Sequence, residues 1–478
     1  MHQGIYPVHA ARELDHQWIS QGMPSHSLME TAVLLMSQYL HFHFQECSFI
    51  VLCGPGNNGG DGYGIARWLD KWGHKVSTTA IYPARTEDCL RNFKLMSSNI
   101  EHISFSQCVE RAFSLPTQTV VIDAILGTGQ RSPDQNLLGI LAKLRAVSQC
   151  TRFVCIDMPT GLNPVTGEWS LPEPPQVSLT LSLGVPKLPL YLSRRPGEVV
   201  EINIGLPTEE SSAPYLHLQP SVLESLAKPH RPDDNKWSRG RVGVFANQGA
   251  SILAANAAFA TGAGLVCVIN EQLHPAAATE TQHRKPAESN AEYFDAILIG
   301  PAFGQDDQCQ ADFWRLWETY EGPMVVDADA LHILSTDPSR PAGGPRILTP
   351  HEQEERALLG HSTATVNRID RLKELRLLGH WVISKAATTV IIPPCSKSSG
   401  WISTSGSPHL GTGGSGDVLA GLVAGLCARL DNLEHAIILG VGAHAGAGER
   451  LTFGARAGSI IPAAREILSE WIDSNQTP

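Results

Sequence analysis

The chain has 478 residues, 42% of them hydrophobic and 17% charged, and a formal net charge of −11. This composition is that of a globular protein and excludes a disordered chain. The length exceeds what one ordinary core supports, so we expect two domains. Acidic and basic residues are interspersed and form no long runs, which excludes a nucleic-acid partner bound through phosphate contacts.

The N-terminal region contains charged side chains, among them Arg12, Glu13 and Asp15, so the apolar region of a signal peptide cannot form there. The longest apolar stretch, residues 418–428, has about half the length that a bilayer span needs, so we expect no membrane partner. The ten cysteines stand singly along the chain, as is typical of a reducing compartment. We therefore expect a cytoplasmic protein.

In chain order, short β-branched runs end in glycine-rich or acidic turns and are followed by helical patterns, first at residues 48–53, 119–125 and 152–156. The same alternation resumes at residues 241–245, 265–269, 296–299, 324–326 and 381–383. Alternating strands and helices predict the α/β class, here with two doubly wound domains. A proline-containing segment without sustained periodicity, residues 205–232, lies between them, so the expected domains are residues 1–215 and 216–478.

The first chemical motif is a glycine loop between a predicted strand and a predicted helix. The strand at residues 49–53 is followed by Gly54-Pro55-Gly56-Asn57-Asn58-Gly59-Gly60-Asp61-Gly62, and residues 63–72 have a helical pattern. Glycines let backbone N–H groups approach an anion, and the helix N-terminus adds partial positive charge. The motif predicts a phosphate-binding loop, and the alternative is a tight turn that binds no ligand.

Two further strand ends have polar residues: Asp-Ala-Ile-Leu-Gly-Thr-Gly at residues 123–129 and Asp-Met-Pro-Thr-Gly at residues 157–161. Ligands of open α/β sheets bind outside the carboxyl ends of the strands, so we expect the three loops to share one crevice. Asn58, Asp123 and Thr160 offer only hard oxygen ligands, which suit an alkali or alkaline-earth cation and not zinc.

Two more stretches, Leu28-Met29-Glu30 and Gly184-Val185-Pro186-Lys187, complete a set of motifs in which residues 5–205 resemble the NAD(P)H-hydrate epimerase family. The resemblance implies a Rossmann-like fold and a potassium ion held by Asn58, Asp123 and Thr160, the last of which replaces a usual serine. It also implies substrate contacts at Asn57, Asn58, Gly59, Gly60, Asp61, Gly127, Thr128, Gly129, Gln130, Arg131, Ser132, Pro133 and Asp157. Val33 stands where the family usually has glycine, which affects the expected helix packing and not the chemistry.

The chemistry of this family requires a proton carrier. In the hydrate, a hydroxyl lies on carbon 6 of the nicotinamide ring, next to the ring nitrogen, so its protonated departure leaves a stabilised iminium cation. Water can then return to either face. Asp157 is the candidate that shuttles the proton, and Lys187 is a candidate that orients the substrate. The alternative for each is a structural ion pair.

The strongest local motif is Gly411-Thr412-Gly413-Gly414-Ser415-Gly416-Asp417-Val418-Leu419-Ala420-Gly421. Its small residues allow a close anion-binding backbone, and Asp417 stands where a helix is expected to begin. An acid at that position can be an ordinary helix N-terminal charge, but its place directly after the glycines favours catalysis. Ribokinase-like enzymes have this loop and aspartate, in which the aspartate is the base toward a substrate hydroxyl and the loop holds phosphate oxygens.

Other stretches narrow this resemblance: Val-Asp-Ala-Asp-Ala-Leu at residues 326–331, Ile-Leu-Thr-Pro-His-Glu at residues 347–352, and Ser407-Pro408-His409. With them, residues 222–470 resemble the NAD(P)H-hydrate dehydratases, which implies a ribokinase-like fold and hydrate contacts at Ala250, Gly304, His351 and Asp417. Nucleotide contacts are implied at Lys385, Ala386, Ala387, Thr388, Thr389, Gly413, Gly414, Ser415 and Gly416. The alternative for His351 is a helix cap or an exposed side chain.

Three loops depart from the dehydratase pattern. The glycine-serine loop after the first strand is shortened to residues 246–250, and Ala386 and Ala302 replace glycines of a Lys-Gly step and a Gly-Pro-Gly-x-Gly loop. If either lost glycine had a positive φ, alanine there strains the backbone by about 1 kcal/mol.

We therefore expect an enzyme that epimerises the R and S hydrates of NADH and NADPH and dehydrates the S hydrate with a nucleotide. ADP or ATP is the expected co-substrate, releasing AMP or ADP and phosphate, and potassium and magnesium are the expected ions. The expected partners are small-molecule substrates and further copies of the chain in a homo-oligomer. The alternatives are a small-alcohol kinase, such as a vitamin kinase, and an active epimerase whose C-terminal half is a nucleotide-binding scaffold.

Overall fold

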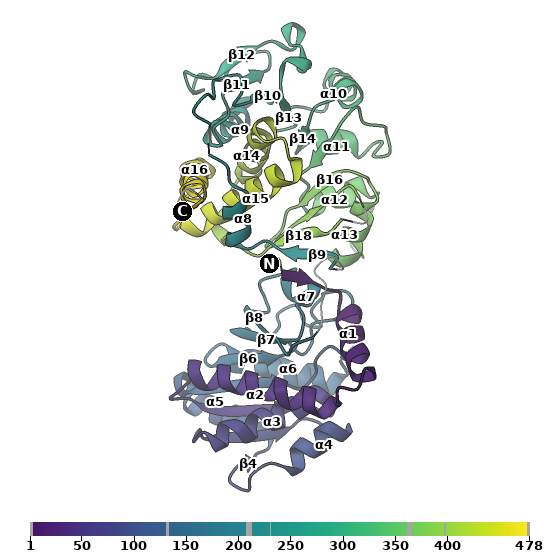
Figure 1. Cartoon of the computed structure of the whole chain (residues 1–478), viewed down its shortest axis with the longest axis vertical. Helices are drawn as coiled ribbons and strands as arrows, with labels where there is room; N and C mark the ends of the chain where they lie inside the picture. Colours follow the sequence, from purple (N-terminus) through teal and green to yellow (C-terminus); the bar gives the residue numbers. More distant parts are fainter. Residues whose placement is uncertain are drawn as a thin grey trace. The chain divides into compact units, whose positions relative to one another are not determined.

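The computed structural model describes residues 3–130, 133–206, 213–229, 231–360, 366–395 and 398–475. The chain separates into two compact units, residues 3–213 and residues 214–478, and each unit has its own sheet (Figure 1). Within the described ranges, no helix combines the length and the apolar character that crossing a membrane requires.

The N-terminal unit is built on a parallel sheet that grows in both directions from β2. Its strands are β2 (Ser48–Cys53), β3 (Val76–Ala80), β4 (Glu101–His102), β5 (Thr119–Ala124), β6 (Arg152–Ile156), β7 (Leu179–Leu183) and β8 (Glu198–Ile202). They lie in the order β4-β3-β2-β5-β6-β7-β8, and every neighbouring pair is parallel. The strand order therefore reverses between β2 and β5, which is where an open α/β sheet binds its ligands.

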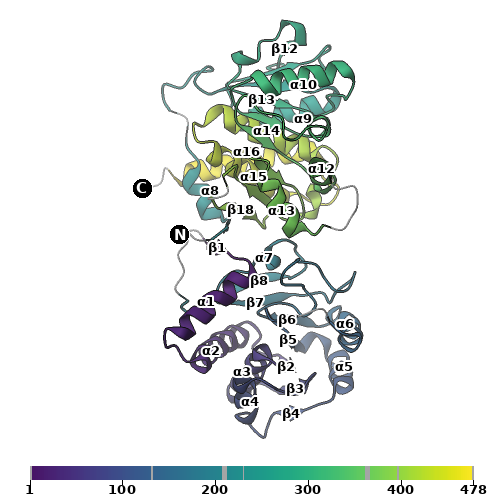
Figure 2. The ribbon, with the colours of Figure 1, turned by 90° about the vertical axis from the view of Figure 1, so that its right-hand side faces the viewer.

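Helices cover both faces of this sheet (Figure 2). Along β2, Phe49 and Val51 belong to one buried cluster with α2 (Ser25–His43) and α3 (Asn57–Lys71). Ile50 and Leu52 belong to a second cluster with α5 (Phe105–Ser114) and α6 (Gln135–Ser148). A strand that is buried on both faces is apolar throughout rather than alternating. Val33 is fully buried between α2 and α3, so the packing accommodates this departure from the family pattern.

The unit also contains further elements. They are β1 (Gln3–Ile5), α1 (Val8–Ser20), α4 (Glu87–Lys94) and α7 (Leu188–Tyr191). Helix α4 packs against α3.

The C-terminal unit has a larger, mostly parallel sheet. Its strands are β9 (Tyr215–His217), β10 (Arg241–Phe245), β11 (Leu265–Ile269), β12 (Gln282–Arg284), β13 (Ala296–Ile299), β14 (Met324–Val326), β15 (Arg346–Leu348), β16 (Trp381–Ser384), β17 (Thr389–Ile392) and β18 (Gly400–Ser403). Their order is β9-β18-β17-β16-β15-β14-β13-β10-β11-β12. Strand β17 is antiparallel to both neighbours, and the strand order reverses between β10 and β13.

Helices also cover both faces of the second sheet. One group packs into a single apolar cluster: α8 (Pro220–Leu226), α9 (Gln248–Ala260), α14 (Ser415–Arg429), α15 (Leu433–Arg450) and α16 (Ala457–Ser474). The other group packs in succession along the opposite face (Figure 1): α10 (Asp307–Thr319), α11 (Asp329–Leu334), α12 (Glu352–Leu358) and α13 (Arg368–Arg376). The predicted α/β class with two parallel-sheet parts is confirmed.

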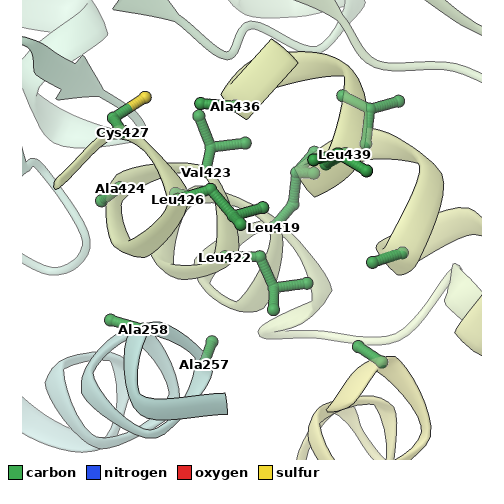
Figure 3. Close-up of a cluster of buried hydrophobic side chains, with 14 of the residues drawn as sticks. Ala257, Ala258, Leu419, Leu422, Val423, Ala424, Leu426, Cys427, Ala436 and Leu439 are labelled. Carbon is green, nitrogen blue, oxygen red and sulfur yellow. The ribbon is translucent and has the colours of Figure 1, made fainter. Parts of the chain in front are cut away.

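Helix α14 touches α9 through small residues in the apolar cluster (Figure 3). A Cβ atom added at Gly421 would lie 2.3 Å from the carbonyl oxygen of Ala254, and one added at Gly425 would lie 2.8 Å from that of Ala258. We call this the α9–α14 contact. Because backbone meets backbone there, the contact fixes the position of α14, whose first turn contains Asp417.

Candidate active sites

The N-terminal unit has a cavity of about 540 Å³ beside the carboxyl ends of β2, β5 and β6. Most of the predicted substrate-contact residues line it: Asn57, Asn58, Asp61, Gly127, Thr128, Gly129, Gln130 and Asp157. Gly59 and Gly60 are buried in the first turn of α3, and Pro133 does not line the cavity. Arg131 and Ser132 lie outside the described residues. The three predicted loops therefore share one crevice at the switch point.

Asp157 and Lys187 form a buried ion pair in this cavity. Lys187 Nζ lies 2.9 Å from Asp157 Oδ1, and their side chains are 4% and 11% exposed. The Thr128 N–H donates to the other carboxylate oxygen at 3.0 Å. Lys187 also donates to the carbonyl oxygens of Leu183 and Val185. Lys187 thus orients the Asp157 carboxylate and balances its charge. This contact is the structural ion pair that was the alternative role for Lys187.

Backbone geometry aims Asp157 at the cavity. Its φ is +64°, in the left-handed region that few residues other than glycine adopt. On the facing loop, a Cβ atom added at Gly127 would lie 2.6 Å from Asp157 Oδ2, so only glycine allows this approach. A residue held against its backbone preference indicates a functional position.

The three predicted cation ligands differ in their surroundings. Asp123 accepts hydrogen bonds from the Thr160 N–H at 2.8 Å, the Thr160 hydroxyl at 2.7 Å and the Ile125 N–H at 3.1 Å. Burial raises the pKa of Asp123, and these hydrogen bonds oppose the rise. Asn58 has no such bonds: its side-chain oxygen and nitrogen are buried without a hydrogen-bond partner among the described residues.

One wall of the cavity, formed by helix α1, was not predicted from the sequence. Helix α1 contributes Arg12, Asp15 and His16 to the lining. Burial raises the pKa of Asp15, the Lys187 ammonium opposes this rise, and Asp157 adds to it. No motif marks α1, and its charged residues have the pattern of an ordinary solvated helix face, so the sequence contained no signal for this role.

A second constellation surrounds the first turn of α14. Burial raises the pKa of Asp417 to about 6, with a further rise from Asp327 after β14 and an opposing effect of Lys385 after β16. Gly416, which precedes Asp417, lies close to the same two side chains, Asp327 and Lys385. A Cβ atom added at Gly416 would lie 3.4 Å from Lys385 Nζ. A carboxyl group with this pKa exchanges its proton near neutral pH, as a general base requires.

Lys385 lies between carboxylates. Its Nζ is 2.7 Å from Asp327 Oδ1 and 3.9 Å from Glu354 Oε2, and the Thr349 hydroxyl donates to the same Asp327 oxygen at 2.6 Å. Burial lowers the pKa of Lys385, but the two carboxylates outweigh burial and raise it overall. Asp327 and Glu354 were not among the predicted site residues. The acidic residue directly after β14 was the signal that could have found Asp327.

Other predicted residues of this half also lie at strand ends. Ala250 is in the first turn of α9, after β10, and the Gly304 N–H, after β13, donates to Asp329 Oδ2 at 3.0 Å. These two loops flank the second switch point. The nucleotide candidates Ala386, Ala387 and Thr388 form the turn between β16 and β17, where Thr389 begins β17. In the glycine loop, Ser415 Oγ lies 3.0 Å from His444 Nε2, and Gly413 and Gly414 precede α14.

His351 is the N-cap of α12. Its Nδ1 accepts the N–H groups of Gln353 and Glu354, and Glu354 in turn accepts the His351 N–H at 2.7 Å. About half of the His351 side chain, 49%, remains exposed. The residue pairs with Lys385 in an isolated parallel bridge. The structure therefore shows the capping alternative, with His351 Nε2 lying 3.5 Å from Glu354 Oε1.

The two alanines that replace family glycines differ in backbone conformation. Ala302 has a φ of +49°, in the strained region, whereas Ala386 does not have a positive φ. The strain expected for a lost glycine is therefore present at position 302 only.

This contrast predicts opposite effects on stability. Ala302→Gly is expected to raise the free energy of unfolding by about 0.5 to 1 kcal/mol, because glycine adopts a positive φ without strain. Ala386→Gly is the matched control and is expected to lower it by about the same amount, because it only loosens the unfolded chain. Urea denaturation midpoints measure both, and shifts in the same direction would contradict the assignment of strain.

Each unit thus places acid–base side chains at the carboxyl ends of parallel strands, one set in a cavity and the other beside a glycine loop. This defines a two-domain α/β enzyme with two separate sites. Residues 242–468 match the family model described as NAD(P)H-hydrate dehydratase, and residues 25–188 match that of the YjeF-related protein N-terminus.

Relatives extend over nearly the whole chain. The bifunctional NAD(P)H-hydrate repair enzyme of Moorella thermoacetica is 31% identical, covering 93% of this chain and 92% of its own. That of Thermanaerovibrio acidaminovorans is 29% identical, covering 97% of each. A ribokinase-like superfamily protein from Enterococcus faecalis has a TM-score of 0.49 at 24% identity, covering 54% of this chain and 96% of its own. The chain belongs to the family of bifunctional NAD(P)H-hydrate repair enzymes.

Proposed function

We propose that this chain repairs hydrated NADH and NADPH in two reactions, one in each unit. The N-terminal cavity epimerises the R and S hydrates, and the glycine-loop site dehydrates the S hydrate with a nucleotide. The observation that supports this division is that Asp157 and Asp417 lie in separate units, each in its own set of charged partners. Family membership over 93% of the chain supports the same pair of reactions.

In the N-terminal cavity, the reaction needs a group that moves a proton at the carbon 6 hydroxyl. Asp157 is the proposed carrier. Its carboxylate forms an ion pair with Lys187 and accepts a hydrogen bond from the Thr128 N–H, which together fix its orientation. A positioned base or acid of this kind contributes about 10² to 10⁴ in rate.

In the C-terminal site, the difficulty is that hydroxide is a poor leaving group. Transfer of a phosphoryl group from ADP or ATP to the carbon 6 hydroxyl releases AMP or ADP and lets phosphate leave instead. Carbon 5 then loses a proton to solvent as the double bond between carbons 5 and 6 forms. Asp417 takes the proton of that hydroxyl, and the N–H groups of residues 413–416 stabilise charge on the transferring group. Lys385 balances the negative charge of Asp327 beside them.

The surroundings of Lys385 suit the magnesium of a metal–nucleotide complex. Asp327, Glu354 and Asp417 provide three carboxyl groups around a single ammonium, so the site has an excess of negative charge. Carboxylate oxygens are the ligands that magnesium prefers. Asp327 and Glu354 would hold the ion, and the ion would neutralise charge on the phosphates.

The surroundings of Asn58 fit a potassium ion. A buried amide with two unpartnered polar atoms costs free energy unless a ligand completes its interactions. Asp123 and Thr160 are hydrogen-bonded to one another, but their oxygens have further lone pairs that can bind a cation. These oxygens would hold the ion and fix the loops that surround the cavity.

Asn58→Ala is therefore expected to abolish a potassium-dependent rise in melting temperature. A ligand at 100 times its dissociation constant stabilises the folded protein by about 2.7 kcal/mol. Melting is measured in potassium chloride against choline chloride at equal ionic strength. Asn57→Ala is the matched control, since Asn57 is exposed and should leave the response intact. An equal potassium response in the Asn58 variant would reject this ion site.

The two reactions are tested together by incubating each purified hydrate epimer with the full chain and separating the products by chromatography. Without nucleotide, either epimer is expected to become a mixture. With ADP or ATP, the S hydrate is expected to disappear as NADH or NADPH forms. A phosphorylated alcohol with an unchanged hydrate pool would support the kinase alternative, and epimerisation alone would support the scaffold alternative.

A further inference from the structure

One buried carboxyl group in the N-terminal cavity, predicted as a substrate contact, has no part in the proton transfer described so far. Asp61 lies on α3, lines the cavity and is 6% exposed. Within the described part of the chain, its carboxyl oxygens make no hydrogen bond and no ion pair. Buried polar groups are almost always paired, so an unpaired carboxyl that lines a cavity is positioned for a ligand.

The surroundings of Asp61 favour its neutral form. Burial raises the pKa of Asp61 well above its ordinary value, and four carboxylates add to the rise: Asp157 after β6, Asp88 on α4, Asp15 on α1 and Glu30 on α2. The Cys89 thiol on α4 also faces Asp61. The surroundings of Asp61 thus disfavour its charged form, whereas the Asp157 carboxylate lies against the Lys187 ammonium.

Inversion at carbon 6 requires chemistry on both faces of the ring. Water leaves from one face and another water must add to the opposite face, so a group on one side cannot serve both steps. Asp61 and Asp157 come from different elements of the cavity, helix α3 and the end of β6. A buried carboxyl group whose surroundings disfavour its charge, together with a carboxylate that is paired with an ammonium, can act as acid and base in one site.

We propose that Asp61 and Asp157 act as a two-sided acid–base pair, in which Asp61 donates the proton to the departing carbon 6 hydroxyl; this inference rests on the proposed epimerase function. The carbon–oxygen bond breaks, the lone pair of the ring nitrogen forms the iminium bond, and water leaves. A second water adds to carbon 6 from the other face, its electrons forming the new bond while Asp157 takes its proton. Asp61 is then ionised and Asp157 protonated, which is the state that catalyses the opposite direction.

Asp61→Asn in the full chain tests this assignment. The variant is expected to lower kcat for interconversion of the R hydrate by about 10² to 10⁴ with little change in KM. It should melt no lower than the wild type, because asparagine has no charge to bury. Asp88→Asn is the matched control. It removes one of the negative charges near Asp61, from a side chain that accepts a hydrogen bond from Ser25. This variant should keep the activity.

The pH profile separates proton donation from mere positioning. Because Asp61 must be protonated, wild-type kcat/KM is expected to fall as the pH rises through the raised pKa of Asp61. Asp88→Asn should move this fall to lower pH, since ionising Asp61 becomes easier beside fewer negative charges. In water labelled with oxygen-18, each wild-type inversion should introduce one solvent oxygen.

The outcomes are distinct. A wild-type chain that fails to interconvert the epimers would overturn the proposed function and this inference with it. With an active wild type, unchanged kcat in Asp61→Asn, a change in KM alone, or full retention of the original oxygen would overturn the acid–base pair. A rate that stays constant or rises with pH would overturn it even if the variant did not fold.

Discussion

Asp417→Asn is expected to lower kcat for nucleotide-dependent dehydration of the S hydrate by about two to four powers of ten while epimerisation proceeds at the wild-type rate. Asparagine has nearly the same shape but cannot accept a proton. Removing the carboxylate also leaves Lys385 paired with Asp327, so folding and nucleotide binding should be retained. Appearance of NADH absorbance after addition of ADP or ATP measures the dehydration rate.

The pH dependence of the wild type gives an independent check. Because the pKa of Asp417 is about 6, the dehydration rate should fall as the pH falls through that value, where protonation removes the base. The residual rate of the Asn variant should lack this fall. Dehydration at the wild-type rate in the variant would instead leave Asp417 without a catalytic role and favour the scaffold alternative.

Asp157→Asn is expected to abolish epimerisation and also to destabilise the N-terminal unit. The variant leaves the Lys187 ammonium, only 4% exposed, without its counter-charge, and breaking a buried ion pair on one side costs about 3 to 5 kcal/mol. Loss of activity alone would therefore not distinguish chemistry from unfolding. Chromatography of the hydrate epimers and denaturation of the same samples measure both effects.

A paired substitution resolves this ambiguity. Asp157→Asn combined with Lys187→Met removes both charges, so most of the lost stability should return, since replacing a whole buried pair by apolar groups is close to neutral. Epimerisation should stay absent because the proton carrier is missing. If the double variant regains epimerase activity together with stability, Asp157 is a structural residue and not the proton carrier.

The sequence predicted the parts of the fold and sites that depend on local pattern. Buried parallel strands are continuous apolar runs, and the loops that follow them contain glycine and acidic residues, so the loops around Asn58, Asp123, Asp157 and Asp417 were found. The α/β class followed from the same alternation. Lys187 was found as well, although its pairing with Asp157 depends on how far β7 and its loop lie from β6.

The sequence could not reveal what depends on distances across the fold. Glu354 is recognisable only through its distance to Lys385, and Asp15 only through the wall that α1 forms. Likewise, nothing in the amino-acid sequence distinguishes Ala302 from Ala386, although only Ala302 of the two has a positive φ. Backbone conformation at a lost glycine is decided by the loop around it.

The α9–α14 contact has a consequence for which substitutions this chain tolerates. At most protein interfaces, side chains absorb a change by rotating, but here the closest atoms belong to the backbone at Gly421 and Ala254. An added methyl group would have to displace the whole helix, and the displacement would reach the glycine loop at its N-terminus. The glycines of α14 in this contact are thus its least replaceable residues, and the accuracy of the predicted phosphate-binding loop is set by positions outside the predicted substrate contacts.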